Sequence, residues 1–153
     1  MPTERQYMRP TPQSCRTSPP HILLIDDNPL DRELTTLALL DVAPGSQLTL
    51  AGSGIEALQM LWAGLQPDLI LLDVNMPGMH GFEVLEALRA DAALTRIPVI
   101  ILTTSGAQQD REQARALQVH GYMVKAPGFE AYVQQMLDLV RWYHATAPLQ
   151  TLA

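Results

Sequence analysis

Residues 68–81 read DLILLDVNMPGMHG, and this stretch combines three local signals. It begins with a strand-length apolar run between Asp68 and Asp73, continues through a Pro77-Gly78 turn and leads into a segment with apolar residues at helical spacing. The run is continuously apolar rather than alternating, which is typical of a strand covered on both faces. We therefore expect a buried parallel strand that is followed, after a turn, by a helix.

The same alternation of apolar run and periodic segment occurs five times along the chain. The predicted strands are residues 22–25, 48–51, 69–72, 98–102 and 122–124, and a helix is expected after each. Strand–helix–strand repetition indicates parallel strands joined by right-handed crossovers. The sequence thus predicts an α/β protein with a flavodoxin-like doubly wound (βα)5 fold, in which a parallel five-stranded sheet has the order 2-1-3-4-5.

Helical spacing also predicts which residues face the core. Leu30, Leu34, Leu37 and Ala38 recur at positions i, i+4, i+7 and i+8, so we expect them to pack inward from the first helix. On the same reasoning, Trp62 and Phe129 are assigned to the buried faces of the second and last helices.

The last helix, expected from about residue 128 to 144, is apolar on more than one face. Four large apolar side chains lie outside its main inward stripe: Tyr132, Leu139, Trp142 and Tyr143. A helix that is apolar nearly all round is generally buried on several sides. Either the C-terminal extension folds back over these side chains or a second copy covers them. We favour a homodimer formed through the fourth helix, the fifth strand and the fifth helix.

Length and composition limit the class of protein. The chain has 153 residues, 47% of them hydrophobic, which suits one domain with a sizeable core. With 16 acidic and 10 basic residues its formal net charge is −6, and such a surface repels nucleic-acid phosphates. The single cysteine, Cys15, excludes an internal disulfide and multi-cysteine zinc sites. With no apolar run of roughly 18 residues and no secretory signal, we expect a cytoplasmic protein that binds neither membrane nor nucleic acid.

Residues 1–20 differ in composition from the rest of the chain. They hold five of the 12 prolines and no periodic pattern, so we expect a disordered N-terminal tail. Residues 21–145 are predicted to form the folded domain, and residues 146–153 a C-terminal extension.

Reactive side chains follow the predicted strands where each strand stops. They are Asp26, Asp27, Asp73, Thr103, Thr104 and Lys125, the only lysine in the chain. In a parallel sheet all carboxyl ends lie along one edge, so these groups are expected to converge. Because the first and third strands are neighbours, the three aspartates meet there, and a cluster of oxygens without nearby His or Cys suits Mg²⁺.

The same edge suggests phosphoryl chemistry. Lys125 is expected to reach back across the fourth strand to the head group of Asp73. A carboxylate beside a divalent cation and facing an ammonium group is suited to nucleophilic attack on phosphorus, which would give an aspartyl phosphate. The chain has no Gly-rich phosphate loop ending in Lys-Ser or Lys-Thr, so ATP is not the expected donor.

With these motifs the chain resembles response-regulator receiver domains of the CheY-like superfamily over about residues 20–145. The resemblance rests on residues 22–29, 68–81, 97–105 (IPVIILTTS) and 121–125 (GYMVK). It implies that Asp73 accepts phosphate from the phosphohistidine of a sensor histidine kinase and that Lys125 pairs with this phosphate.

The resemblance also implies a metal site and a switch. The Mg²⁺ ligands would come from two strand ends and the loop after the second: Asp26, through water, with Asp27, Asp73 and the backbone carbonyl of Asn75. Thr103 would swing towards the phosphoryl group, and Tyr122 would turn inward with it. Such a protein assists its own phosphorylation and dephosphorylation but is not an enzyme with a turned-over substrate. It signals to a downstream protein by contact or by onward phosphotransfer.

Three further features are similar to phytochrome-associated single-domain response regulators: the missing Lys-Pro pair, the LTTS segment and the aromatic C-terminal region. They imply a light-sensing kinase, such as a bacteriophytochrome, as the partner. Receivers usually have proline directly after the lysine, whereas Lys125-Ala126-Pro127 displaces it by one residue. The usual cis peptide bond and the shape of the following loop therefore stay open.

Other functions fit parts of the sequence. Residues 52–57, GSGIEA, match a dinucleotide-binding G-x-G-x-x-A pattern, but the strand before them is polar and lies at the edge of the predicted sheet. A phosphatase-like hydrolase that forms an aspartyl phosphate would want a second acid two residues after Asp73, where this chain has Asn75. A receiver that signals without phosphate is a further alternative.

Overall fold

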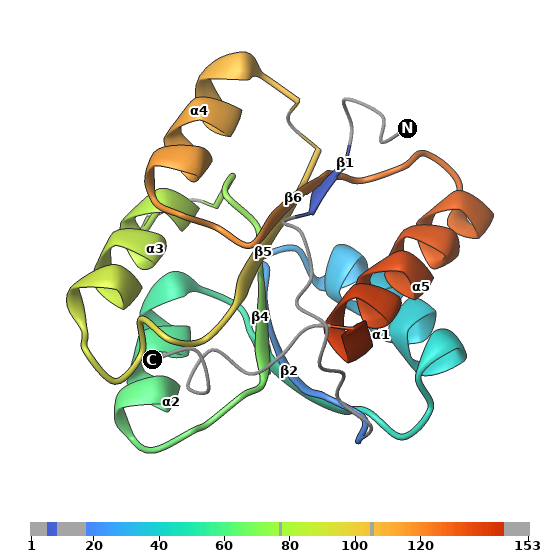
Figure 1. Cartoon of the computed structure of the whole chain (residues 1–153), viewed down its shortest axis with the longest axis horizontal. Coiled ribbons are helices and arrows are strands. Elements are labelled where there is room, and N and C mark those ends of the chain that lie inside the picture. Colours follow the sequence, from blue (N-terminus) through green and yellow to red (C-terminus); the bar gives the residue numbers. More distant parts are fainter. Residues whose placement is uncertain (1–5, 9–17, 77, 105, 146–153) are drawn as a thin grey trace.

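The computed structural model of the chain describes residues 6–8, 18–76, 78–104 and 106–145 (Figure 1). Cys15 and the C-terminal extension, residues 146–153, lie outside these ranges. Within the described ranges, no helix has the length and apolar character that a membrane crossing requires. The elements in chain order are β1 (Gln6–Met8), β2 (His21–Ile25), α1 (Pro29–Val42), β3 (Gln47–Ala51), α2 (Gly54–Trp62), β4 (Leu69–Leu72), α3 (Gly81–Ala90), β5 (Val99–Thr103), α4 (Gln108–Ala116), β6 (Gly121–Val124) and α5 (Phe129–Ala145).

Five parallel strands form the predicted sheet, and a sixth strand is added at one edge. The strand order is β1-β6-β5-β4-β2-β3, so the parallel strands follow the order 2-1-3-4-5. The predicted fold class is therefore confirmed. All five parallel strands end at the same edge of the sheet, where ligands bind in doubly wound folds.

The N-terminal tail differs from the sequence-based expectation of disorder at residues 6–8. These residues form β1, which pairs antiparallel with β6 and places Tyr7 opposite Tyr122. An edge strand offers unpaired N–H and C=O groups that an extended segment can satisfy. Neither proline content nor periodicity reports on such pairing, so β1 could not be predicted from the sequence.

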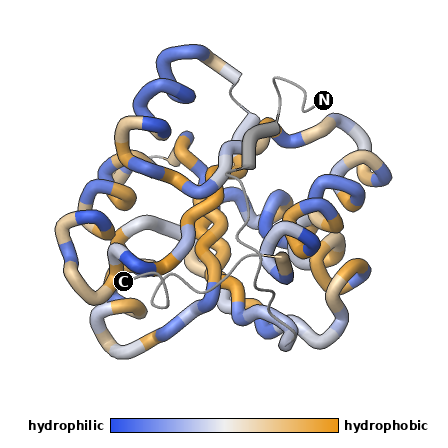
Figure 2. Tube along the Cα trace, viewed as in Figure 1, coloured by the Kyte–Doolittle hydropathy of each residue, from blue (hydrophilic) through white to orange (hydrophobic). Residues whose placement is uncertain are grey.

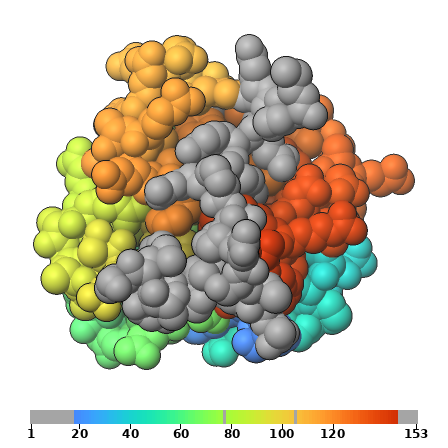
Figure 3. Space-filling model, in the orientation of Figure 1, coloured from blue at the N-terminus to red at the C-terminus, as the bar shows by residue number. Residues whose placement is uncertain are grey.

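The helices cover the sheet in two layers, with α1 and α5 on one face and α2, α3 and α4 on the other (Figure 1). The same two groups of helices lie on opposite sides of the molecular surface (Figure 3). Successive strand residues alternate between the two layers. Leu23 and Ile25 pack with residues of α2 and α3, whereas Ile22 and Leu24 pack with residues of α1 and α5. Both sets are buried, which explains why the central strands are apolar throughout (Figure 2).

α1 faces the core with only part of the predicted stripe, because Ala38 is buried whereas the three leucines are exposed. Its buried residues are Thr35, Ala38 and Leu39. The leucines of the predicted stripe are 62%, 37% and 52% exposed: Leu30, Leu34 and Leu37. The helix carries leucine on several sides, so periodicity alone does not select the face, and the small residues permit close packing on α5.

Trp62 and Phe129 are also exposed rather than buried, at 62% and 46%. Trp62 is the last residue of α2 and Phe129 the first of α5. Each lies at an end of its helix, where the neighbouring elements no longer cover the inward face.

The apolar faces of α5 are buried within one chain. The four side chains that favoured a homodimer are at most 7% exposed: Tyr132, Leu139, Trp142 and Tyr143. They belong to the core shared with α1 and the sheet. The Tyr132 hydroxyl is hydrogen-bonded to that of Thr35 on α1, and burial raises the pKa of Tyr132 to about 12. The all-round apolar pattern therefore does not require a second copy.

Candidate functional site

Three aspartates meet at the carboxyl ends of β2 and β4. The two strands are neighbours, with Ile25 opposite Leu72, so the residues that follow them lie side by side. Asp26, Asp27 and Asp73 each have a carboxylate oxygen within 4.8 Å of the others. Asp26 is 2% and Asp73 9% exposed. The structure thus brings together the carboxylates whose convergence strand order predicts.

Backbone hydrogen bonds fix the two strand ends. The Asp73 N–H donates to the Ile25 carbonyl oxygen at 3.0 Å. The Asp26 N–H donates to the Ala51 carbonyl oxygen at 3.1 Å, so both ladders continue past the last strand residue. Gly81 lets α3 start directly against this edge, because a Cβ there would lie 2.5 Å from the Asp73 carbonyl oxygen. The carboxylates are therefore attached to well-fixed backbone.

The loops after both strands turn back onto the carboxylates. The Asn75 N–H donates to Asp73 Oδ1 at 3.2 Å, and the Asn28 N–H donates to Asp26 Oδ1 at 3.0 Å. The Asn28 side chain also caps α1 by accepting hydrogen bonds from backbone N–H groups of its first turn. These bonds hold one oxygen of each carboxylate and so limit rotation of both groups.

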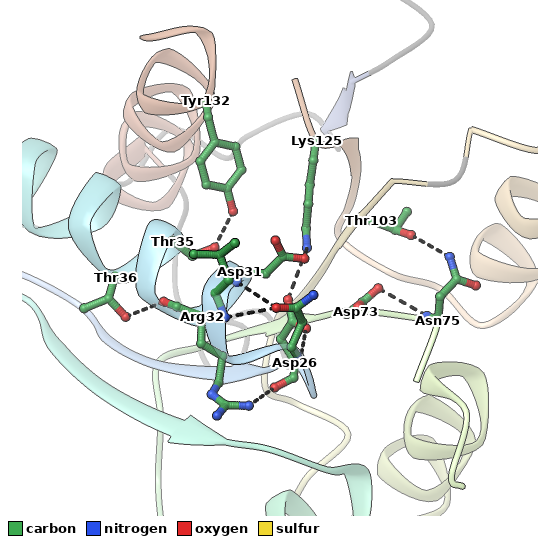
Figure 4. Close-up of polar contacts among 12 residues, drawn as sticks. Asp26, Asp31, Arg32, Thr35, Thr36, Asp73, Asn75, Thr103, Lys125 and Tyr132 are labelled. Carbon is green, nitrogen blue, oxygen red and sulfur yellow. Dashed lines mark hydrogen bonds and ion pairs between the residues drawn. The ribbon is translucent and has the colours of Figure 1, made fainter. Parts of the chain in front are cut away.

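Lys125 reaches the pocket from the end of β6 but pairs with other carboxylates than the sequence predicts (Figure 4). Its Nζ lies 3.1 Å from Asp26 Oδ2 and 3.2 Å from Asp31 Oδ2, whereas the expected partner was Asp73. The Lys125 side chain is only 11% exposed, and a buried charge needs compensating partners. Burial lowers its pKa, but attraction to Asp26 and to Asp73 outweighs burial, so the pKa lies above its ordinary value.

Asp31 is a member of this site that sequence reasoning missed. It lies in the first turn of α1, where acidic residues are common because they favour the helix N-terminus. The sequence offered one signal for Asp31, namely its position about one helical turn after Asp26 and Asp27. The first turn of α1 lies beside the same pocket as these aspartates. The ion pair with Lys125 connects α1 to the end of β6.

The environment of Asp73 disfavours its negative charge. Burial raises the pKa of Asp73 to about 6, and the charges of Asp26 and Asp27 raise it as well. The hydrogen bond from the Asn75 N–H and the Lys125 ammonium lower the pKa but do not compensate. An added cation beside Asp73 would therefore favour its ionised form.

The donor set fits a divalent cation. Asp26, Asp27 and Asp73 contribute only carboxylate oxygens, the hard ligands that Mg²⁺ and Mn²⁺ prefer. Counting Asp31, four carboxylates gather at this edge, whereas the described cations beside them are the Lys125 ammonium and the Arg32 guanidinium, which donates to the Asp26 carbonyl oxygen. A cation at this edge would reduce the repulsion among the carboxylates, so both the chemistry and the charge of the pocket suit a metal site.

The predicted hydroxyl residues take different positions. Thr103 is fully buried at the end of β5, and its Oγ1 accepts a hydrogen bond from Asn75 Nδ2 at 3.3 Å. Thr104, which follows it, is exposed. Tyr122 is buried on β6, with the Arg111 guanidinium 5.6 Å from its ring centroid. Thr103 thus contacts the loop after Asp73, while the Tyr122 ring lies beside α4.

Comparison with known proteins places this pocket in a family context. A sequence model of the response regulator receiver domain matches residues 22–136. Rcp1 of Synechocystis sp. is 33% identical over 143 residues, which covers 89% of this chain and 97% of Rcp1. RpaA of Synechocystis sp., a DNA-binding dual master transcriptional regulator, is 37% identical over 122 residues. These cover 80% of this chain but 49% of RpaA, so the chain spans about half the length of that relative.

Solved structures show the same similarity. The phosphorylated cyanobacterial phytochrome response regulator RcpA aligns with a TM-score of 0.79 at 31% identity, covering 85% of this chain and 97% of RcpA. The Mn²⁺-bound form of Rcp1 aligns with a TM-score of 0.75 at 29% identity, covering 84% of this chain and 97% of Rcp1.

Proposed function

The chain belongs to the response regulator receiver domain family, and we propose that Asp73 is its phosphoacceptor in a two-component system. The observation that carries this proposal is the meeting of Asp73 with Asp26 and Asp27 within 4.8 Å, beside the ammonium group of Lys125. The phosphoryl donor would be the phosphohistidine of a sensor histidine kinase in the cytoplasm. Phosphorylation would change which proteins the chain binds, without turnover of a substrate.

In this transfer one Asp73 carboxylate oxygen attacks the phosphorus. The new O–P bond forms as the P–N bond to the kinase histidine breaks, and the electron pair stays on the imidazole nitrogen. Asp73, with a pKa of about 6, is largely ionised at neutral pH and can act as the nucleophile. Lys125 would leave Asp31 and pair with a phosphoryl oxygen, and the Thr103 hydroxyl would donate a hydrogen bond to another.

A divalent ion, Mg²⁺ in our proposal, would supply charge neutralisation for the phosphoryl oxygens. Asp26, Asp27 and Asp73 would hold it, together with the backbone carbonyl of Asn75. The carboxylate donor set supports this assignment, as does the Mn²⁺-bound form of the relative Rcp1.

The partner kinase would dock beside the pocket. Leu30, Leu34 and Leu37 form an exposed stripe on α1, which begins next to the aspartates. An apolar helix face in water suits association with another helix. Similarity to the phytochrome response regulator RcpA makes a bacteriophytochrome our preferred kinase. A light-dependent transfer from such a kinase, absent with a kinase that lacks the photoreceptor, would test this choice.

The deciding experiment is phosphorylation with acetyl phosphate in Mg²⁺. We expect one hydroxylamine-sensitive phosphoryl group per chain, lost in Asp73→Asn and kept in the exposed control Asp41→Asn. Removal of the metal with EDTA should prevent the reaction. Many phosphates released per chain would instead indicate a hydrolase, and no adduct would indicate a receiver that signals without phosphate.

A homodimer through α4, β6 and α5 stays part of the proposal, but the α5 side chains that favoured it are buried within one chain. Sedimentation with and without beryllofluoride tests it. An unchanged monomer mass in both conditions would remove the dimer and leave the phosphoacceptor role untouched.

A further inference from the structure

The backbone on both sides of Lys125 is bound by one buried side chain. Gln135 of α5 is only 8% exposed, although it is polar. Its Nε2 donates to the Val124 carbonyl oxygen at 2.8 Å, and its Oε1 accepts a hydrogen bond from the Ala126 N–H at 2.9 Å. One amide group therefore holds the residue before Lys125 and the residue after it.

Strand pairing contributes one further bond at this point. Val124 is the last residue of β6, so strand pairing ends there apart from one bond, in which the Lys125 N–H donates to the Thr103 carbonyl oxygen at 2.7 Å. Pro127 has no N–H to donate, and Gly128 has a φ of 88°, in the region that favours glycine. The Gln135 amide thus binds the backbone of this loop at its first turn, on both sides of Lys125.

The displaced proline explains why a glutamine is needed here. A proline at position 126 would restrict its own φ and would have no N–H. Ala126 keeps its N–H, and this N–H needs an acceptor because it lies in a partly buried position. The described residues contain no cis peptide bond, so the Lys125–Ala126 bond is trans. Gln135 accepts a hydrogen bond from the Ala126 N–H and so holds the loop with the Lys125–Ala126 peptide bond trans.

We propose that Gln135 is a positioning residue for Lys125. By holding the backbone at Val124 and Ala126, it directs the long Lys125 side chain into the carboxylate pocket, where Nζ meets Asp26 and Asp31. Lysine has four rotatable side-chain bonds, so its ammonium group can occupy many positions. A fixed backbone at Lys125 limits these positions to those that the side chain can reach from one starting point. The inference rests on the proposed function in one respect, namely that Lys125 then serves the phosphoryl group.

The chain offers a direct readout, because Lys125 is its only lysine. Labelling with ¹⁵N-lysine gives one ammonium signal, and no assignment is needed. The test variant is Gln135→Met, which keeps the length of the side chain but removes both hydrogen bonds. The matched control is Gln134→Met, on the same helix, where the glutamine is exposed and its amide donates to Asp138.

In the metal-free protein we expect the Lys125 ammonium signal of Gln134→Met to equal that of the wild type, with slow solvent exchange. In Gln135→Met the signal should move to the position and fast exchange of a free lysine. An unchanged signal in a folded Gln135→Met protein would overturn the proposal. This measurement involves no phosphorylation, so its result is independent of the proposed function.

A second measurement asks whether Gln135 acts through Lys125. With Mg²⁺ present, Gln135→Met should bind beryllofluoride, a phosphoryl mimic, about tenfold more weakly than the wild type, since tenfold corresponds to the net loss of roughly one good hydrogen bond. In a Lys125→Ala background the same substitution should have no further effect. A similar tenfold loss there would show a general structural role and would contradict the proposal. If Lys125→Ala alone leaves binding unchanged, the proposed role of Lys125 fails, and the ammonium signal still decides the positioning role.

Discussion

Replacing Asp73 by asparagine should stabilise the metal-free protein at neutral and alkaline pH. Burial and two neighbouring carboxylates raise the pKa of Asp73 from 3.8 to about 6 in the folded state. A carboxyl group whose pKa is raised on folding destabilises the folded protein wherever it is ionised. The penalty develops as the pH rises from 3.8 to about 6 and is constant above that range.

The size of the effect follows from the same values. A tenfold change in a protonation constant corresponds to about 1.4 kcal/mol, so a rise from 3.8 to about 6 corresponds to about 3 kcal/mol. Water and counter-ions at the mouth of the pocket screen part of this penalty, which leaves an expected gain of about 1.5 kcal/mol. Asparagine keeps an oxygen that can accept the Asn75 N–H, so the loop after β4 should not be disturbed.

The assay is urea denaturation in EDTA between about pH 4.5 and pH 8, with the free energy of unfolding compared at each pH. Asp73→Asn should gain about 1.5 kcal/mol near pH 8 and progressively less towards pH 4.5, while the exposed control Asp41→Asn shows no such trend. Mg²⁺ should then stabilise the wild type more than Asp73→Asn. A gain that does not depend on pH, or a loss of stability near pH 8, would refute the electrostatic account.

Three substitutions test the packing around the site, all measured by urea denaturation. Tyr132→Phe leaves the buried Thr35 hydroxyl without its partner and should lower the free energy of unfolding by about 1–2 kcal/mol, part of which Thr35→Val should recover. Gly81→Ala places a Cβ 2.5 Å from the Asp73 carbonyl oxygen and should destabilise by roughly 2 kcal/mol or more. Leu37→Gln, at a side chain that is 52% exposed, should stay within about 0.5 kcal/mol of the wild type, and a loss of several kcal/mol would place Leu37 in the core after all.

The sheet and the aspartate cluster were predictable because both follow from strand order. Apolar runs of strand length identify the parallel strands, and their carboxyl ends must lie along one edge. Asp26 and Asp73 therefore come together whatever the details of the helices. The prediction needs only backbone geometry, which hydrophobic patterning reports well.

The predictions that failed depend on choices that patterning does not encode. Leu37 and Ala38 both fit a helical period, and only the close approach of α5 selects the smaller residue for the interface. The ion-pair partners of Lys125 are the carboxylates that its long side chain can reach. One of them, Asp31, lies on α1, which follows a different strand, so strand order alone does not predict the pair. Strand β1 pairs with β6 through backbone N–H and C=O groups at the edge of the sheet. Backbone groups are the same in every sequence, so this pairing leaves no pattern of side chains to read.

The pairing of Lys125 has a consequence for the order of events at the site. In the structure its ammonium group directs two of its three N–H donors at Asp26 and Asp31, so these carboxylates compete with a phosphoryl group for Lys125. Departure from Asp26 alone would remove the ion-pair partner of a carboxylate that is 2% exposed and would leave its charge to the Asn28 N–H and the bound divalent ion. Asp31 is 34% exposed and can be solvated instead.

We therefore expect Lys125 to leave Asp31 first, and Asp31→Asn to tighten beryllofluoride binding in Mg²⁺ by up to about tenfold. Weaker binding in Asp31→Asn would show that Asp31 orients Lys125 rather than competing for it.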